Sequence, residues 1–144
     1  MKQSRLHHVG FVVPSIDAEI EGFKRSLGAG WDGVIFDDPV QKVRVTFIQT
    51  HQSSDARIEL VEPASDDSPV AAFLQKGGGL HHLCYEVPDL DAELKDVRAQ
   101  QGLIVKRPSP AVAFGGRRIA WILTAQKLLL EFLEEAASRP KLKS

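Results

Sequence analysis

Hydrophobic and polar positions follow the same pattern twice along this chain. Residues 6–19 read LHHVGFVVPSIDAE and residues 80–93 read LHHLCYEVPDLDAE, with eight of the fourteen positions identical. In each copy a segment with the alternating faces of a strand precedes apolar residues at the spacing of one side of a helix. The pattern therefore predicts a strand followed by an amphipathic helix, at two places offset by 74 residues.

Both predicted helices have start and stop signals. Ser15 and Asp89 stand where a side chain caps a first turn, and Gly28 and Gly102 stand where a helix ends in left-handed geometry. The apolar stripes match as well, with Ile16, Ile20 and Phe23 in the first helix and Leu90, Leu94 and Val97 in the second.

The repeat continues beyond these helices. VRVTFIQT at 43–50 aligns with RRIAWILT at 117–124, and RIELVE at 57–62 aligns with LLLEFLE at 128–134. Each unit thus reads strand, helix, strand, strand, strand, which predicts an α+β fold built from tandem βαβββ modules. The predicted strands are 6–13, 33–37, 43–50, 57–62, 80–87, 103–107, 117–124 and 128–134.

We expect one domain with two modules joined by a linker. The linker contains a short predicted helix, for which Asp67 or Ser68 is the expected cap. The expected boundaries are about 5–64 for the first module, 65–79 for the linker and 80–135 for the second module, within a domain of 1–137 followed by a basic tail at 138–144.

Composition narrows the possible functions. A hydrophobic content of 43% and a charged content of 26% are ordinary for a soluble globular protein, and the net charge of −1 argues against a nucleic-acid partner. No apolar run approaches the roughly 20 residues of a membrane span. Because Cys84 is the only cysteine and MKQSRLHHVG lacks the apolar stretch of a signal peptide, we expect a cytoplasmic protein.

Strand alternation separates the two histidines of each doubled pair. His8 and His82 share the less bulky face of their strands with residues such as Gly10 and Cys84, and they should point into one cavity. His7 and His81 fall on the opposite face, where we expect structural or partly exposed side chains.

Two glutamates occupy matching places in the last strand of each module. Glu131 interrupts the almost wholly apolar LLLEFL, where an unpaired charge would be costly to bury, and Glu59 matches it in RIELVE. Two imidazoles and two carboxylates at symmetric positions suit one divalent ion such as Co, Zn, Ni, Fe or Mn. The candidate metal ligands are His8, Glu59, His82 and Glu131.

These features resemble the vicinal oxygen chelate superfamily, which includes glyoxalase I, bleomycin-resistance proteins, extradiol dioxygenases and methylmalonyl-CoA epimerases. The resemblance covers about residues 5–135 and is strongest to the epimerases, in HHVGFVVPSID, IELVEPASDDSPVAAFLQKGGGLHHLCYEV and GGRRIAWI…LLLEFLE. It implies a cup-shaped mixed sheet with helices on the outside, one divalent ion at the base of the cup, and a homodimer. The ligands that it implies are the same four residues.

The function implied by the resemblance is that of a metal-dependent epimerase or isomerase. Such an enzyme moves a proton at the carbon next to the carbonyl of a small acyl thioester, here methylmalonyl-CoA. Glu131 and Glu59 are the expected acid and base. Two departures from the epimerases stand out: Val45 takes the place of a second catalytic acid found in some bacterial members, and LTAQKLLLE is shorter than the corresponding loop.

Other members of the superfamily are alternatives. The ligand set allows a glyoxalase-type lactoylglutathione lyase, although DSPVAAFL argues against it. An extradiol dioxygenase would leave Glu59 as a surplus ligand, and a metal-free binding protein would not need the four ligands. A tailoring enzyme of specialised metabolism is a further possibility because of the shortened loop.

Five residues are candidates for the substrate pocket. Phe47 and Trp121 occupy matching strand positions and could wall the cup, or simply pack in the core. Gly115, Gly116 and Arg117 could hold a carboxylate or phosphate, with a plain hairpin turn as the alternative.

Overall fold

The computed structural model describes residues 3–50 and 56–136, which form two successive units around one sheet. The first unit contains β1 (Arg5–Val12), α1 (Ile16–Leu27), β2 (Gly30–Trp31), β3 (Phe36–Asp38), β4 (Val43–Gln49) and β5 (Arg57–Pro63). Helix α2 (Ala71–Gln75) then leads to β6 (Gly79–Val87), α3 (Leu90–Ala99), β7 (Leu103–Pro110), the 3-10 turn η1 (Val112–Phe114), β8 (Arg118–Leu123) and β9 (Leu129–Glu134). The predicted basic tail at 138–144 lies outside the described residues.

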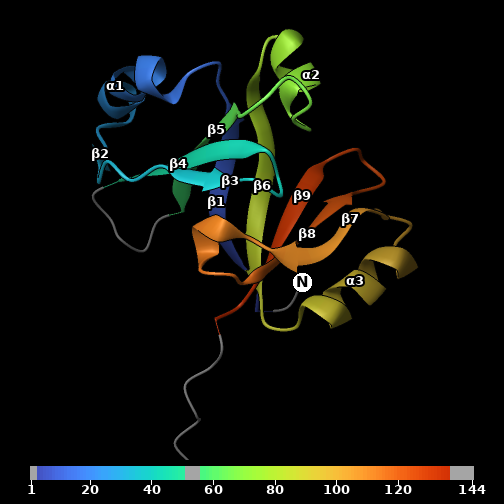
Figure 1. Cartoon of the computed structure of the whole chain (residues 1–144). Coiled ribbons are helices and arrows are strands. Elements are labelled where there is room, and N and C mark those ends of the chain that lie inside the picture. The colour runs from blue at the N-terminus through green and yellow to red at the C-terminus, as the bar shows by residue number, and fades with distance from the viewer. Residues whose placement is uncertain (1–2, 51–55, 137–144) are drawn as a thin grey trace, which may run out of the picture.

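The nine strands form one mixed sheet whose two halves meet at a central seam. Its order is β2-β4-β5-β1-β6-β9-β8-β7, with β3 paired to β4 (Figure 1). Strands β1 and β6 pair antiparallel at the seam, and each pairs in parallel with the last strand of its own unit, β5 or β9. The predicted α+β fold of tandem modules is confirmed, and the two modules build one sheet.

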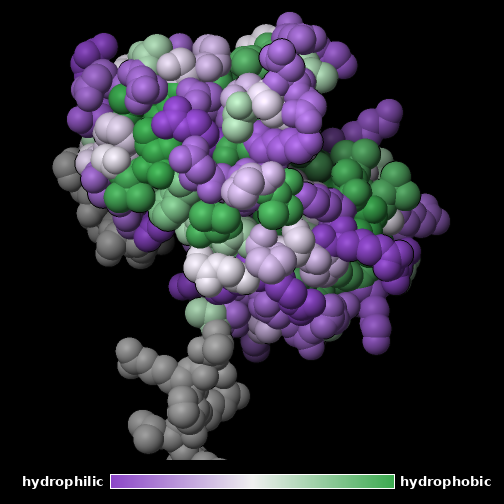
Figure 2. All heavy atoms as spheres, in the orientation of Figure 1, coloured by the Kyte–Doolittle hydropathy of each residue, from purple (hydrophilic) through white to green (hydrophobic). Residues whose placement is uncertain are grey.

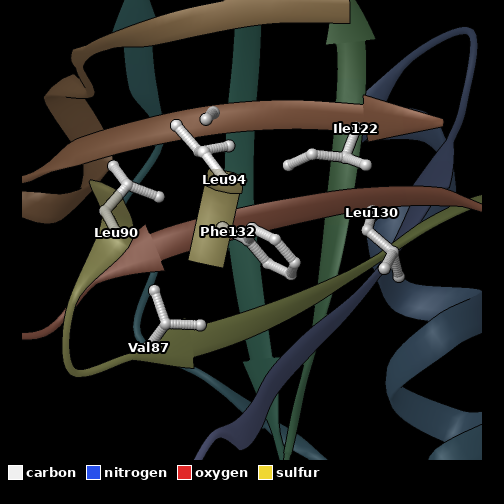
Figure 3. Close-up of a cluster of buried hydrophobic side chains, with 7 residues drawn as sticks. Val87, Leu90, Leu94, Ile122, Leu130 and Phe132 are labelled. Atoms are coloured by element: carbon white, nitrogen blue, oxygen red, sulfur yellow. The ribbon is translucent and has the colours of Figure 1, made fainter. Parts of the chain in front are cut away.

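Helices α1 and α3 cover one face of this sheet, whereas the short α2 packs on the other. Phe11 packs with Ile16 and Ile20 of α1, as the predicted stripe requires. The second unit repeats this arrangement: Figure 3 shows Val87, Leu90, Leu94, Ile122, Leu130 and Phe132 meeting between α3 and strands β6, β8 and β9. Because α1 and α3 occupy this face, the strand residues that point the other way are available for a site.

The helix ends follow the predicted signals with one exception. Ser15 accepts a hydrogen bond from the Ala18 N–H at 3.2 Å, and Asp89 accepts one from the Ala92 N–H at 3.0 Å. Gly28 ends α1 in left-handed geometry with φ of 58°. After α3, however, the left-handed residue is Gln101, with φ of 65°, and the prediction of Gly102 is wrong.

Two predicted boundaries also differ. The expected strand 33–37 is replaced by the short β2 and β3, which pair with different parts of β4. Neither predicted cap begins α2, whose cap residue is Val70 without a side-chain hydrogen bond. Asp67 instead pairs with Lys42, which ties the linker to the β3–β4 turn.

The surface in Figure 2 is mainly hydrophilic over the helices, with hydrophobic residues gathered in patches between them. Among the described residues, the helices are too short and too polar for any of them to cross a membrane.

Candidate metal centre

Two rows of neighbouring residues cross the sheet and bring the candidate ligands together. In one row, Trp121 on β8, Glu131 on β9, Cys84 on β6 and His8 on β1 are successive partners. Partners in adjacent strands point to the same side of a sheet. The register therefore places a histidine of the first module and a glutamate of the second on the face opposite α1 and α3.

The second row is the symmetric counterpart of the first. Phe47 on β4, Glu59 on β5, Gly10 on β1 and His82 on β6 are successive partners. This row supplies a glutamate of the first module and a histidine of the second. The two rows adjoin at the β1–β6 seam, and each module contributes one candidate ligand to each row.

The donor atoms of the four side chains surround one point. The Nε2 atoms of His8 and His82 are 3.2 Å apart. Oε1 of Glu131 lies 3.0 Å from Nε2 of His8 and 3.5 Å from Nε2 of His82, and Oε1 of Glu59 lies 3.4 and 3.2 Å from the same atoms. Ligands about 2.0–2.2 Å from one ion are roughly 2.8–3.6 Å from one another. The spacing therefore fits a single divalent ion held within one chain.

The hydrogen bonding of the cluster also fits an ion. All four side chains are buried, and Oε1 of Glu131 has no hydrogen-bond partner of acceptable geometry among the described residues, although Nε2 of His8 is close. A buried carboxylate oxygen without a donor is destabilising unless a cation balances it. A bound ion would satisfy this oxygen.

The electrostatics of the cluster favour positive charge at its centre. Burial disfavours charge on His8 and His82, yet the neighbouring carboxylates outweigh burial and raise the pKa of both rings. Burial likewise disfavours charge on Glu59 and Glu131, but the imidazoles lower the pKa of both carboxyls. Both glutamates are therefore ionised, and protons on the histidines compete with a metal ion for the same centre.

The first histidine of each pair lies beside the ligand and not across the sheet from it. The register of β1 with β6 shifts twice, with His7 as the extra residue of one bulge and His81 as that of the other. His81 lines the same cavity as His82, and the ring of His7 packs on Phe114, which also lines it. Both side chains are half-buried, as expected, but the predicted strict alternation is wrong here because a bulge re-aims side chains.

Gly10 makes room for the ring of His82. A Cβ atom at this position would lie 2.1 Å from Cε1 of His82 and 2.6 Å from its Nε2. Any larger residue would therefore displace a ligand. This role is not readable from the sequence, where Gly10 is simply the residue that matches Cys84.

A cavity of about 240 Å³ opens beside the cluster. Its lining includes His82, Glu59 and Glu131 and is otherwise mainly apolar, with Val45 and Phe114 among the lining residues. Sequence reasoning missed three polar residues of this lining, namely Asp38, Gln41 and Lys106. They come from β3, the following turn and β7, whose side-chain directions depend on tertiary packing.

The structure brings only part of the predicted substrate pocket to this cavity. Trp121 lines the cavity and contacts the ring of His82, with ring centroids 4.7 Å apart. Phe47 instead packs on the ring of His8 at 5.4 Å. Gly115 and Gly116 form a turn with φ of 63° and 87°, and they do not line the cavity.

Arg117 has partners away from the cavity. Its Nη1 donates to Oε2 of Glu86 at 2.8 Å and to the carbonyl of Glu134 at 3.3 Å. Glu86 also accepts from Arg5, so the guanidinium groups neutralise a buried carboxylate. Arg117 therefore stabilises the sheet at this end, and the structure does not place it in the candidate site.

Comparison with known proteins agrees with this geometry. The sequence profile of the Glyoxalase/Bleomycin resistance protein/Dioxygenase superfamily matches residues 7–121. The chain belongs to this superfamily. An ethylmalonyl-CoA/methylmalonyl-CoA epimerase of Cereibacter sphaeroides is 32% identical over 120 residues, which cover 82% of this chain and 87% of the relative.

Solved structures extend the similarity to the fold. Methylmalonyl-CoA epimerase of Mycobacterium tuberculosis is 31% identical with a TM-score of 0.79, covering 92% of this chain and 88% of that one. A variant of the Streptomyces coelicolor methylmalonyl-CoA epimerase in complex with 2-nitronate-propionyl-CoA is 26% identical with a TM-score of 0.77, covering 92% and 98%. The resemblance to epimerases of the superfamily that the sequence indicated is confirmed.

We expect that Gly10→Ala will damage the cluster. The added methyl group overlaps the His82 ring, which should lower the free energy of unfolding by about 1–3 kcal/mol and weaken metal binding. Gly22→Ala is the matched control, because Gly22 lies in α1 with open space around it, and alanine there should be neutral or stabilising by about 0.5–1 kcal/mol. Denaturant unfolding and a Zn(II) titration measure both effects. Equal stability and equal metal affinity of the two variants would contradict the assigned role.

Proposed function

We propose that this protein is a metal-dependent epimerase that moves a proton at the carbon next to the carbonyl of a small acyl thioester, with methylmalonyl-CoA as the first candidate. The observation that carries the proposal is the cluster of His8, Glu59, His82 and Glu131, whose donor atoms converge beside a mainly apolar cavity. Epimerase relatives that span most of the chain support it.

The proposed site contains one divalent ion of Co, Zn, Ni, Fe or Mn. When bound, this ion would supply a Lewis acid for the substrate carbonyl. His8 and His82 would hold it as neutral ligands, and the two glutamates would balance its charge. The mainly apolar lining of the cavity excludes water from the substrate carbon and strengthens these interactions.

Glu59 and Glu131 are the proposed acid and base. Epimerisation removes a proton from one side of a carbon and returns it to the other, and these two carboxylates come from symmetric rows on either side of the seam. Val45, at the position of the second acid in some epimerases, is apolar and lines the cavity. Asp38 also lines the cavity, but its Oδ1 already accepts from the backbone N–H groups of Val40 and Gln41.

Lys106 is the proposed partner for an anionic group of the substrate. Of the described residues that line the cavity, it is the only lysine or arginine, and no carboxylate among the described residues pairs with it. Its strand partner is Trp121, which places it one strand further from the cluster along the first row. An acyl thioester with a negative charge at some distance from its carbonyl fits this arrangement.

A glyoxalase-type lyase is the second candidate, because two histidines and two glutamates suit that chemistry as well. Its glutathione-derived substrate carries two carboxylates, however, and among the described lining residues Lys106 is the only lysine or arginine that could pair with them. Incubation with a glutathione hemithioacetal separates this activity from epimerisation.

We further propose that the protein is a cytoplasmic homodimer. The exposed apolar side chains of Leu103 and Val105 on the edge strand β7 support an interface between two copies. Sedimentation velocity at two concentrations tests this, and a monomer at both would contradict it.

Proton exchange in D₂O tests the function and the two-base assignment together. The Co(II)-loaded protein should exchange the C2 proton of methylmalonyl-CoA and convert each epimer to the other. Glu131→Gln and Glu59→Gln should each abolish interconversion. Each variant should still exchange the proton of one epimer without inversion, because the remaining carboxylate removes and returns the proton on its own side.

Metal content must be measured for both variants, since each substitution also changes a proposed ligand. A variant that holds metal and still interconverts the epimers at the original rate would contradict the assignment of that glutamate. Lack of exchange in metal-loaded wild-type protein would contradict the epimerase itself.

Substitution of Lys106 tests the anion partner. Lys106→Met should raise KM for an anionic acyl thioester by roughly tenfold, which corresponds to about 1.4 kcal/mol, with a smaller effect on kcat. Lys95→Met is the matched control, because Lys95 is exposed on α3, on the face opposite the cavity. Steady-state kinetics with both variants measure the difference, and an unchanged KM for Lys106→Met would refute the assignment.

A further inference from the structure

Each ligand histidine has a second close contact on the side away from the cluster. Nδ1 of His8 lies 2.8 Å from Nδ1 of His7, and Nδ1 of His82 lies 2.8 Å from Nδ1 of His81. Both distances are those of a hydrogen bond. The same contact therefore occurs twice, once in each half of the pseudo-twofold.

Ligation decides which nitrogen is the donor. Nε2 of His8 faces the cluster, so this nitrogen must be unprotonated when it binds an ion, and the ring proton is then on Nδ1. The Nδ1–H group needs an acceptor, and Nδ1 of His7 is at hydrogen-bond distance. His7 must then be neutral with its own proton on Nε2. The same reasoning applies to His82 and His81.

We propose that the first histidine of each pair is a positioning residue for the metal centre: His7 and His81 accept the Nδ1–H of His8 and His82 and so fix each ligand ring with Nε2 toward the ion. The inference rests on the proposed metal site. It gives both histidines of each doubled pair a function, one as the ligand and the other as the acceptor of its ring proton.

The bulges make this contact possible. In a regular strand, adjacent side chains point to opposite faces, and His7 would be across the sheet from His8. Because His7 and His81 are the extra residues of two bulges, each ring stays beside its ligand. The paired rings are nearly perpendicular, with interplanar angles of 78° for His7 and His8 and 89° for His81 and His82.

Aromatic neighbours hold the two acceptor rings in place. His81 contacts Phe73 with ring centroids 4.8 Å apart and Trp121 at 6.1 Å. His7 contacts Phe114 at 5.3 Å. A neutral imidazole as acceptor adds no charge to a centre that already contains two carboxylates, and the dication is therefore balanced by its ligands alone.

Metal affinity of matched variants tests the proposal. Competition titrations with Zn(II) and a chromophoric chelator should show binding that is about 10–100-fold weaker in His7→Leu and in His81→Leu, as for other partners of metal-binding histidines. His7→Asn and His81→Asn keep an acceptor and should recover most of the affinity. Phe23→Leu is the control, because Phe23 packs in the α1 cluster on the other face of the sheet, and it should leave the affinity unchanged.

Nitrogen NMR of the wild-type protein gives an independent result that does not depend on any variant folding. In the Zn(II)-loaded protein, long-range ¹H–¹⁵N spectra should show protonated Nδ1 in His8 and His82 and protonated Nε2 in His7 and His81. Ligation through Nδ1, or a proton on Nδ1 of His7 or His81, would overturn the proposal.

The outcomes separate this inference from the proposed function. Wild-type protein that binds Zn(II), together with leucine variants of unchanged affinity, would refute the positioning role and leave the metal centre intact. Wild-type protein that binds no ion at all would refute both.

Discussion

The structure depends on bringing two ionised carboxylates and two imidazoles together in a buried place. Two like charges so close together are unfavourable in a low-dielectric environment unless positive charge lies between them. The two related modules bring the four side chains together, because each contributes one histidine and one glutamate. The antiparallel β1–β6 seam sets His8 and His82 on adjacent strands, and the parallel pairing of β5 and β9 with that seam adds Glu59 and Glu131. A cation at the centre would balance the charge of the two carboxylates.

Other features of the sheet follow from this requirement. Helices α1 and α3 pack on one face and leave the other to the four donors, and their apolar stripes stabilise the sheet from outside the site. In each row, the residue between the glutamate and the histidine is small. Gly10 leaves space for the ring of His82, and Cys84 is the matching residue in the other row. The arginines that neutralise Glu86 lie at the end of the seam, where they do not compete for the glutamates of the cluster.

Much of this arrangement was predictable because the same pattern of residues occurs twice in the sequence. The repeat indicated the modules, and alternation along two strands selected His8 and His82. The predictions that failed concern places where the chain departs from regular geometry or pairs over a long distance. A bulge shifts His81 to the cavity side, a left-handed Gln101 replaces Gly102 at the end of α3, and Arg117 pairs with a carboxylate 31 residues away in sequence. The bulge and the ion pair have no local pattern, because each is decided by which distant strand lies alongside, whereas Gln101 takes a conformation for which glycine is the usual signal.

The cavity lining also limits how the proton can be moved. A separate base would have to lie on the lining near the cluster, but Val45 is apolar and Asp38 is already bonded to two backbone N–H groups of its own turn. The carboxylates that remain on the lining are Glu59 and Glu131, which are also the ligand candidates. In the proposed function, each would both hold the ion and exchange a proton with the substrate. Because the two residues occupy symmetric rows, the duplication that brings the four donors together would also place an acid and a base on opposite sides of one carbon.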